Sequence, residues 1–102
     1  MEKSLYEALK EISEICNDPV REVSDTTLAY HIDLLHKTTE KYLKYSSSFN
    51  AFNQRAIGLI LIAFISYIKK EVKAKKRSTA KLDKIQETFE QVQEQQKQRK
   101  RF

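Results

Sequence analysis

A run of apolar residues near the middle of the chain restricts the available folds more strongly than any other feature. Residues 56–68 contain one plainly polar side chain, Ser66. As a helix this run spans roughly 20 Å at about 1.5 Å per residue, whereas a bilayer core is about 30 Å thick. Arg55 precedes the run and Lys69 and Lys70 follow it, so neither flank adds apolar length. The run is therefore too short to cross a membrane.

Large apolar side chains cover most of the circumference of this predicted helix, which is unlike an interfacial helix with one basic face. Burying them is worth roughly 1.5 to 3 kcal/mol each, so the segment should dominate the core that it joins. We expect it at the centre of a helical bundle, with Gly58 and Ala63 marking close approach of other helices. The large apolar side chains of this predicted helix are Ile57, Leu59, Ile60, Leu61, Ile62, Phe64 and Ile65.

The composition favours an all-α fold. The 102 residues include one glycine and one proline, too few for a series of tight β-turns. A chain of this length is the size of one domain, so residues 1–102 are predicted to form a single helical-bundle domain.

Capping residues and apolar stripes predict four helices. Ser4 and Glu7 have the spacing of a capping box, Ser24 precedes the second stripe, and a serine run follows residue 45. We predict helices at about 4–16, 25–45, 50–74 and 79–96. With short loops, consecutive helices should be antiparallel, giving a four-helix bundle with a frayed basic tail at 97–102.

Charge is divided unevenly along the chain. Residues 1–45 carry six basic and nine acidic side chains, a net charge of −3, while residues 46–102 carry thirteen and five, a net charge of +8. Ten of these thirteen basic side chains form two runs, 69–77 and 97–101, which an antiparallel bundle would place at opposite ends. Such asymmetry is typical of a protein with an electrostatic partner, although a solvated surface explains it equally well.

Catalytic and metal-binding patterns are absent from the sequence. His31 and His36 are five residues apart and do not share a helix face, and Cys16 lies on the predicted apolar stripe of its helix. We therefore expect these to be structural residues in a protein that is not an enzyme and has no cofactor. The lone cysteine and the acidic, amphipathic N-terminus favour a cytoplasmic location.

Nearly the whole chain resembles the immunity proteins of pediocin-like bacteriocins, especially the enterocin A immunity group. The resemblance lies in LYEALKEISEI, Asp18-Pro19 leading to Ser24, LAYHIDLLHKTTEKYLKY, NQRAIGLILIAFISYIKK and LDKIQETF. It implies a basic four-helix bundle in the cytosol that protects the cell against a pore-forming peptide. The ending EQVQEQQKQRKRF departs from the family pattern.

The resemblance also implies a partner and a region that recognises it. The implied partner is the membrane-embedded mannose phosphotransferase permease with bound bacteriocin, contacted from the cytosolic side. In the family, the C-terminal half largely decides which peptide is recognised. The candidate partner-binding residues are therefore Lys75, Lys76, Arg77, Lys81, Lys84, Lys97, Arg99, Lys100, Arg101 and Phe102.

Three other interpretations of the basic half remain open. Lysine and arginine attract anionic lipid, so a basic end can contact the inner membrane face. A small nucleic-acid-associated regulator is disfavoured because Lys81 and Lys84 alternate with Asp83 and Glu87 on the last helix instead of forming one basic face. A structural interaction module, such as a homodimer, is the third.

Overall fold

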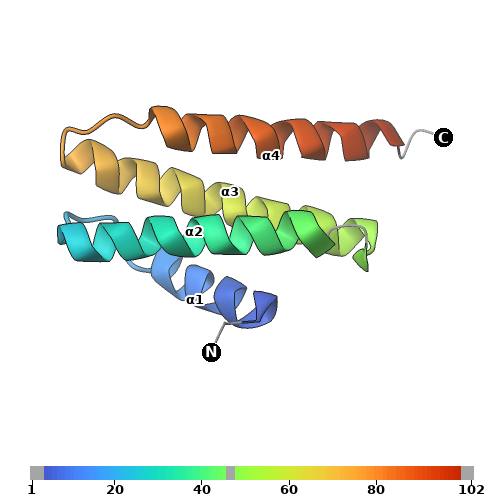
Figure 1. Ribbon diagram of the computed structural model, residues 1–102, viewed down its shortest axis with the longest axis horizontal. Coiled ribbons are helices and arrows are strands. Elements are labelled where there is room, and N and C mark those ends of the chain that lie inside the picture. Colours follow the sequence, from blue (N-terminus) through green and yellow to red (C-terminus); the bar gives the residue numbers. More distant parts are fainter. Residues whose placement is uncertain (1–3, 46–47, 100–102) are drawn as a thin grey trace.

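The computed structural model describes residues 4–45 and 48–99, and for side chains all of these except 51 and 92–99. These ranges contain four helices, α1 (Leu5–Asn17), α2 (Asp25–Tyr45), α3 (Ala51–Ala74) and α4 (Ala80–Arg99), and no strand. Successive helices run in alternating directions (Figure 1). The predicted all-α, antiparallel four-helix bundle is confirmed.

Short polar side chains fix where the helices begin. The Glu7 amide donates to Ser4 Oγ at 3.2 Å, and the Asn53 amide donates to Asn50 Oδ1 at 2.8 Å. Ser24 Oγ accepts from the amide of Thr27 at 3.1 Å at the start of α2. Each bond satisfies an amide donor that the first helical turn leaves free. As a result, the first three helices begin within one residue of the predicted positions.

Helix α3 lies at the centre of the bundle, as predicted. It packs against α1, α2 and α4, whereas α4 rests mainly on α3. Leu61, Phe64, Ile65 and Ile68 are fully buried on α3. The other helices add apolar side chains to the same core: Ala8 and Ile12 from α1, Leu28, Leu34, Leu35 and Tyr42 from α2, and Leu82 and Phe89 from α4.

One side of α3 is exposed, which corrects the prediction that this helix is buried all round. Leu59 is 51% exposed, Phe52 is 78% exposed, and Ala63 also faces solvent. Gly58 is buried, as expected for close helix approach. Three surrounding helices do not enclose a fourth completely, so one stripe of α3 is not covered by the described residues. Ala63 therefore does not mark a helix crossing.

Helix α4 continues through Arg99, three residues beyond its predicted end. Glutamine, glutamate, lysine and arginine have high intrinsic helix propensity, so a helix can extend without an apolar stripe. Residues 97–99 therefore belong to α4 instead of the predicted frayed tail. Residues 100–102 lie outside the described residues.

Candidate functional site

The connection between α3 and α4 contains the first group of predicted partner-binding residues. Helix α3 ends with the Lys76 amide donating to the Lys73 carbonyl at 2.9 Å and the Arg77 amide to the Val72 carbonyl at 3.1 Å. Lys76 has φ of 57°, the left-handed conformation that this type of helix end requires and that glycine usually supplies. A lysine here costs roughly 1 to 2 kcal/mol relative to right-handed backbone. The chain thus has a charged residue at a position where glycine would adopt the required backbone conformation at lower cost.

Two of the three basic residues in this connection hold it to the start of α2. Lys75 Nζ lies 3.0 Å from Asp25 Oδ1, and an Arg77 guanidinium nitrogen lies 3.2 Å from the same oxygen. The Lys75 side chain is 12% exposed. Both residues therefore have an internal structural role, which the sequence pattern did not predict.

This contact changes the acidity of Asp25. The hydrogen bond from Lys75, followed by the charge of Arg77, lowers the pKa of the Asp25 carboxyl below its usual 3.8. In the same way, the hydrogen bond from Lys69 Nζ, which lies 2.6 Å from Asp83 Oδ1, lowers the pKa of Asp83. Both contacts, one between the connection and α2 and one between α3 and α4, favour the ionised carboxylate.

Replacing Asp25 with asparagine is expected to lower the Tm at neutral pH and to have less effect in acid. Because the pKa of Asp25 is lowered by folding, its contribution is present above the unfolded pKa and is lost as pH falls through the folded pKa. The difference in Tm between the wild type and Asp25→Asn should therefore narrow below about pH 4. Thermal melts from pH 7 to 2 measure it. A difference that widens on acidification contradicts the assignment.

The remaining candidate lysines are exposed. The ammonium groups of Lys76, Lys81 and Lys84 form no hydrogen bond or ion pair with any described residue, and the same holds for Lys70 and Lys73 on α3. Their ammonium groups are thus available to a partner. The structure separates these available lysines from Lys75 and Arg77, although Lys70, Lys73 and Lys76 lie in the same basic run of the sequence.

The second group of candidates lies at the opposite end of the bundle. Lys97 and Arg99 belong to the last turns of α4, whose end is remote from the α3–α4 connection (Figure 1). Their side chains are outside the described set, as are residues Lys100, Arg101 and Phe102 altogether. Because α3 and α4 run in opposite directions, the end of α4 that contains Lys97 and Arg99 lies away from the α3–α4 connection.

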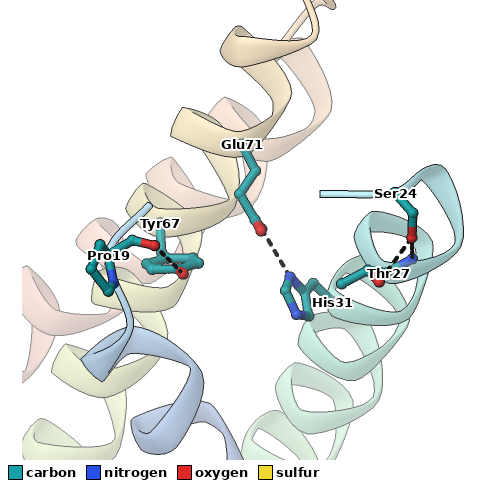
Figure 2. A network of polar contacts seen from close by, with 6 residues as sticks. All are labelled: Pro19, Ser24, Thr27, His31, Tyr67 and Glu71. Atoms are coloured by element: carbon teal, nitrogen blue, oxygen red, sulfur yellow. Dashed lines mark hydrogen bonds and ion pairs between the residues drawn. The ribbon is translucent and has the colours of Figure 1, made fainter. Parts of the chain in front are cut away.

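A buried histidine–carboxyl pair lies between α2 and α3, and sequence analysis did not predict it. His31 Nδ1 is 2.9 Å from Glu71 Oε1, and the Glu71 side chain is fully buried (Figure 2). The His31 ring also packs edge-on against Phe64, with centroids 6.1 Å apart. Glu71 Oε2 has no hydrogen-bond partner among the described residues. His31 and Glu71 are 40 residues apart in the sequence, so no local pattern indicates that they pair.

Cys16 and Tyr67 lie close enough to this pair to respond to it electrostatically. Burial, followed by the negative charge of Glu71, raises the pKa of the Cys16 thiol and that of the Tyr67 phenol. The Tyr67 hydroxyl donates to the Pro19 carbonyl at 3.4 Å, which links α3 to the connection after α1 (Figure 2). Since a raised pKa disfavours the thiolate, Cys16 is not prepared as a nucleophile.

The described residues include no group of three or more histidine, cysteine or acidic side chains arranged to hold a metal ion. Within 4–45 and 48–99, no helix has the combination of length and apolarity needed to cross a membrane. Comparisons with protein-family models, with curated proteins and with solved structures return no match.

Proposed function

We propose that this protein is an immunity protein that protects a cell against a pediocin-like, pore-forming bacteriocin. In this proposal it acts from the cytoplasm on the membrane-embedded mannose phosphotransferase permease with its bound peptide. It works by binding, with no catalytic step, and confers resistance to an antimicrobial peptide. The antiparallel bundle and the order of its apolar stripes agree with the resemblance that suggested this function.

The observation that carries the proposal is the set of exposed lysines in the C-terminal half whose ammonium groups have no hydrogen-bond or ion-pair partner among the described residues. Lys76, Lys81 and Lys84 lie on the connection and on α4, the region that the resemblance implicates in recognition. Internal ion pairs would have left these side chains less available. A peripheral contact of the same lysines with an anionic membrane face is compatible with this role.

The same residues give less support to a nucleic-acid-associated regulator. A duplex-binding surface needs several cations along one face, positioned to reach successive phosphates. Here Lys69, Lys75 and Arg77 are engaged with aspartates, which reduces the positive charge available at the α3–α4 end. Protein recognition therefore explains the charge arrangement better.

A challenge assay tests the proposal. We expect a sensitive strain that carries the permease and expresses this protein to survive at least one member of a panel of pediocin-like peptides. Substituting Lys81→Gln and Lys84→Gln together should lower the tolerated peptide concentration several-fold. Lys10→Gln with Lys44→Gln removes the same charge from exposed positions on α1 and α2 and should leave protection intact.

Protection against no member of the panel would refute the assignment. The basic end is tested through Lys76→Gln, since changing Lys75 or Arg77 would also break their contacts with Asp25. A chain shortened after residue 96 tests the tail. Circular dichroism of each variant establishes that the helices are retained.

A further inference from the structure

A small apolar groove lies between α2 and α4, next to the exposed lysines of α4. Its volume is about 200 Å³, and it is lined by Thr39, Leu43, Ile85, Thr88 and Phe89. Leu43 is 48% exposed at its edge, although it is a leucine beside a hydrophobic core. The surface of the groove is almost entirely apolar.

The groove is one helical turn long and follows the helix axes. Its residues on α2, Thr39 and Leu43, are four positions apart, and those on α4, Ile85 and Phe89, are likewise one turn apart. An apolar cavity of about 150 Å³ accommodates benzene, so this groove suits one large apolar side chain such as phenylalanine or leucine. Two helices that run in the same direction also form a trough in which a third helix can pack.

The packing of this part of the bundle is incomplete. The Thr39 hydroxyl oxygen is buried and has no hydrogen-bond partner among the described residues. A buried hydroxyl without a partner destabilises the folded protein, because it has lost its hydrogen bonds to water without replacement. If this surface served only to hold α2 against α4, we would expect an apolar side chain at position 39 and a less exposed side chain at position 43.

Charge on α4 differs between its two edges, and exposed Glu87 lies between them. At about 100° per residue, Lys81, Lys84 and Thr88 fall within about 60° of one another on the edge that borders the groove. Asp83 lies on the other edge, where it pairs with Lys69, and Glu90 accepts a hydrogen bond from Gln86 there. On the α2 side of the groove, exposed Glu40 carries a negative charge and exposed His36 is not counted as charged. The positive charge beside the groove therefore comes from α4.

We propose that this groove binds an amphipathic helix of a partner protein, which inserts one large apolar side chain between α2 and α4. Carboxylates on the partner helix, one turn away from the inserted side chain, pair with Lys81 and Lys84. The groove provides the apolar contact, and the two lysines make the surface selective for an acidic partner. The inference rests on the proposed function only in placing the partner on α4, and it is tested without a protection assay.

The probe is a synthetic alanine-based helical peptide with a central phenylalanine and glutamates one turn to each side. Titrated into the isotope-labelled full chain, it should shift the NMR signals of Leu43, Ile85 and Thr88. Replacing its phenylalanine with alanine, or its glutamates with lysines, should weaken binding by about tenfold or more, since the contact has an apolar and an ionic component.

Variants of the protein locate the contact. Thr88→Phe fills the groove from an exposed position and should abolish the shifts, while Lys81→Glu with Lys84→Glu should weaken binding by roughly tenfold. Lys70→Glu with Lys73→Glu makes the same charge change on the exposed face of α3 and should have little effect. Equal weakening by the two charge variants, or binding retained in Thr88→Phe, would overturn the proposal.

Two further outcomes would also overturn it. Shifts at the groove that grow with protein concentration in the absence of peptide would assign the groove to a second copy of the chain. Binding to vesicles of anionic phospholipid that Thr88→Phe abolishes, with no response to the peptide, would assign it to lipid. Protection in the challenge assay together with no peptide binding would refute the groove proposal and leave the proposed function standing.

Discussion

Replacing His31 with alanine is expected to destabilise the protein by about 3 to 5 kcal/mol, because it leaves the Glu71 carboxyl buried without its partner. Glu71 is fully buried, and its hydrogen bond to His31 is the one that the described residues provide for its carboxyl group. Nδ1 is the ring atom of His31 that makes this hydrogen bond. Loss of the imidazole also removes a ring contact with Phe64.

Replacing both His31 and Glu71 with apolar residues should lower the free energy of unfolding much less than His31→Ala does. A buried ion pair can often be exchanged for apolar residues of similar volume with little loss of stability. We therefore expect His31→Leu with Glu71→Leu to recover most of the stability that His31→Ala loses. Urea unfolding of each variant at pH 7 gives the free energies, and their non-additivity measures the coupling between the two positions.

His36→Ala is the matched control for this experiment. His36 lies on the same helix but is exposed, so its replacement should change the free energy of unfolding by less than about 0.5 kcal/mol. If His31→Ala proves no more destabilising than His36→Ala, the buried pair has no role in stability. A double variant less stable than His31→Ala would show that the site cannot be filled by apolar side chains.

The sequence predicts the helices well because their signals are local. The capping oxygens of Ser4, Ser24 and Asn50 lie within three residues of the amides that they bind. The apolar stripes likewise repeat at intervals of three and four residues, which place them on one face. Four helix starts and the central position of α3 follow from these short-range patterns.

The candidate site depends on contacts between distant parts of the chain, so the sequence predicts it only in outline. Lys75 and Lys76 are adjacent and have the same charge, yet one is held by Asp25 and the other is exposed. The difference arises from the left-handed turn at Lys76, which reverses the direction of the chain. The pairing of His31 with Glu71 and the groove beside Leu43 also require the packed bundle.

Packing also decides which side of an apolar helix is exposed. The apolar run of α3 has large side chains on nearly every face, so hydropathy alone predicts complete burial. The number of neighbouring helices determines the outcome, and three neighbours leave Leu59 and Phe52 exposed. This limit applies to any central helix in a chain that is too short to surround it.

Replacing Phe89 with alanine is expected to cost about 3 to 5 kcal/mol and to release α4 from the rest of the bundle. Phe89 is 2% exposed and packs against Tyr42 of α2, with ring centroids 5.7 Å apart. Helix α4 otherwise rests mainly on α3, to which Leu82 and the Lys69–Asp83 ion pair hold it. The truncation therefore removes the largest fully buried side chain among the described residues of α4, the helix with the fewest neighbours.

Phe89→Ala should destabilise α4 more than it destabilises the other three helices. Amide hydrogen exchange of Phe89→Ala is expected to show lost protection through α4, while α1, α2 and α3 keep most of theirs, because segments with few buried contacts open at lower free energy. Leu35→Ala, at a fully buried position on α2, should instead reduce protection throughout the protein. A uniform loss of protection in Phe89→Ala would show that α4 unfolds only together with the core. In that case, α4 is an integral part of the cooperative unit and not a helix that can detach to accommodate a partner.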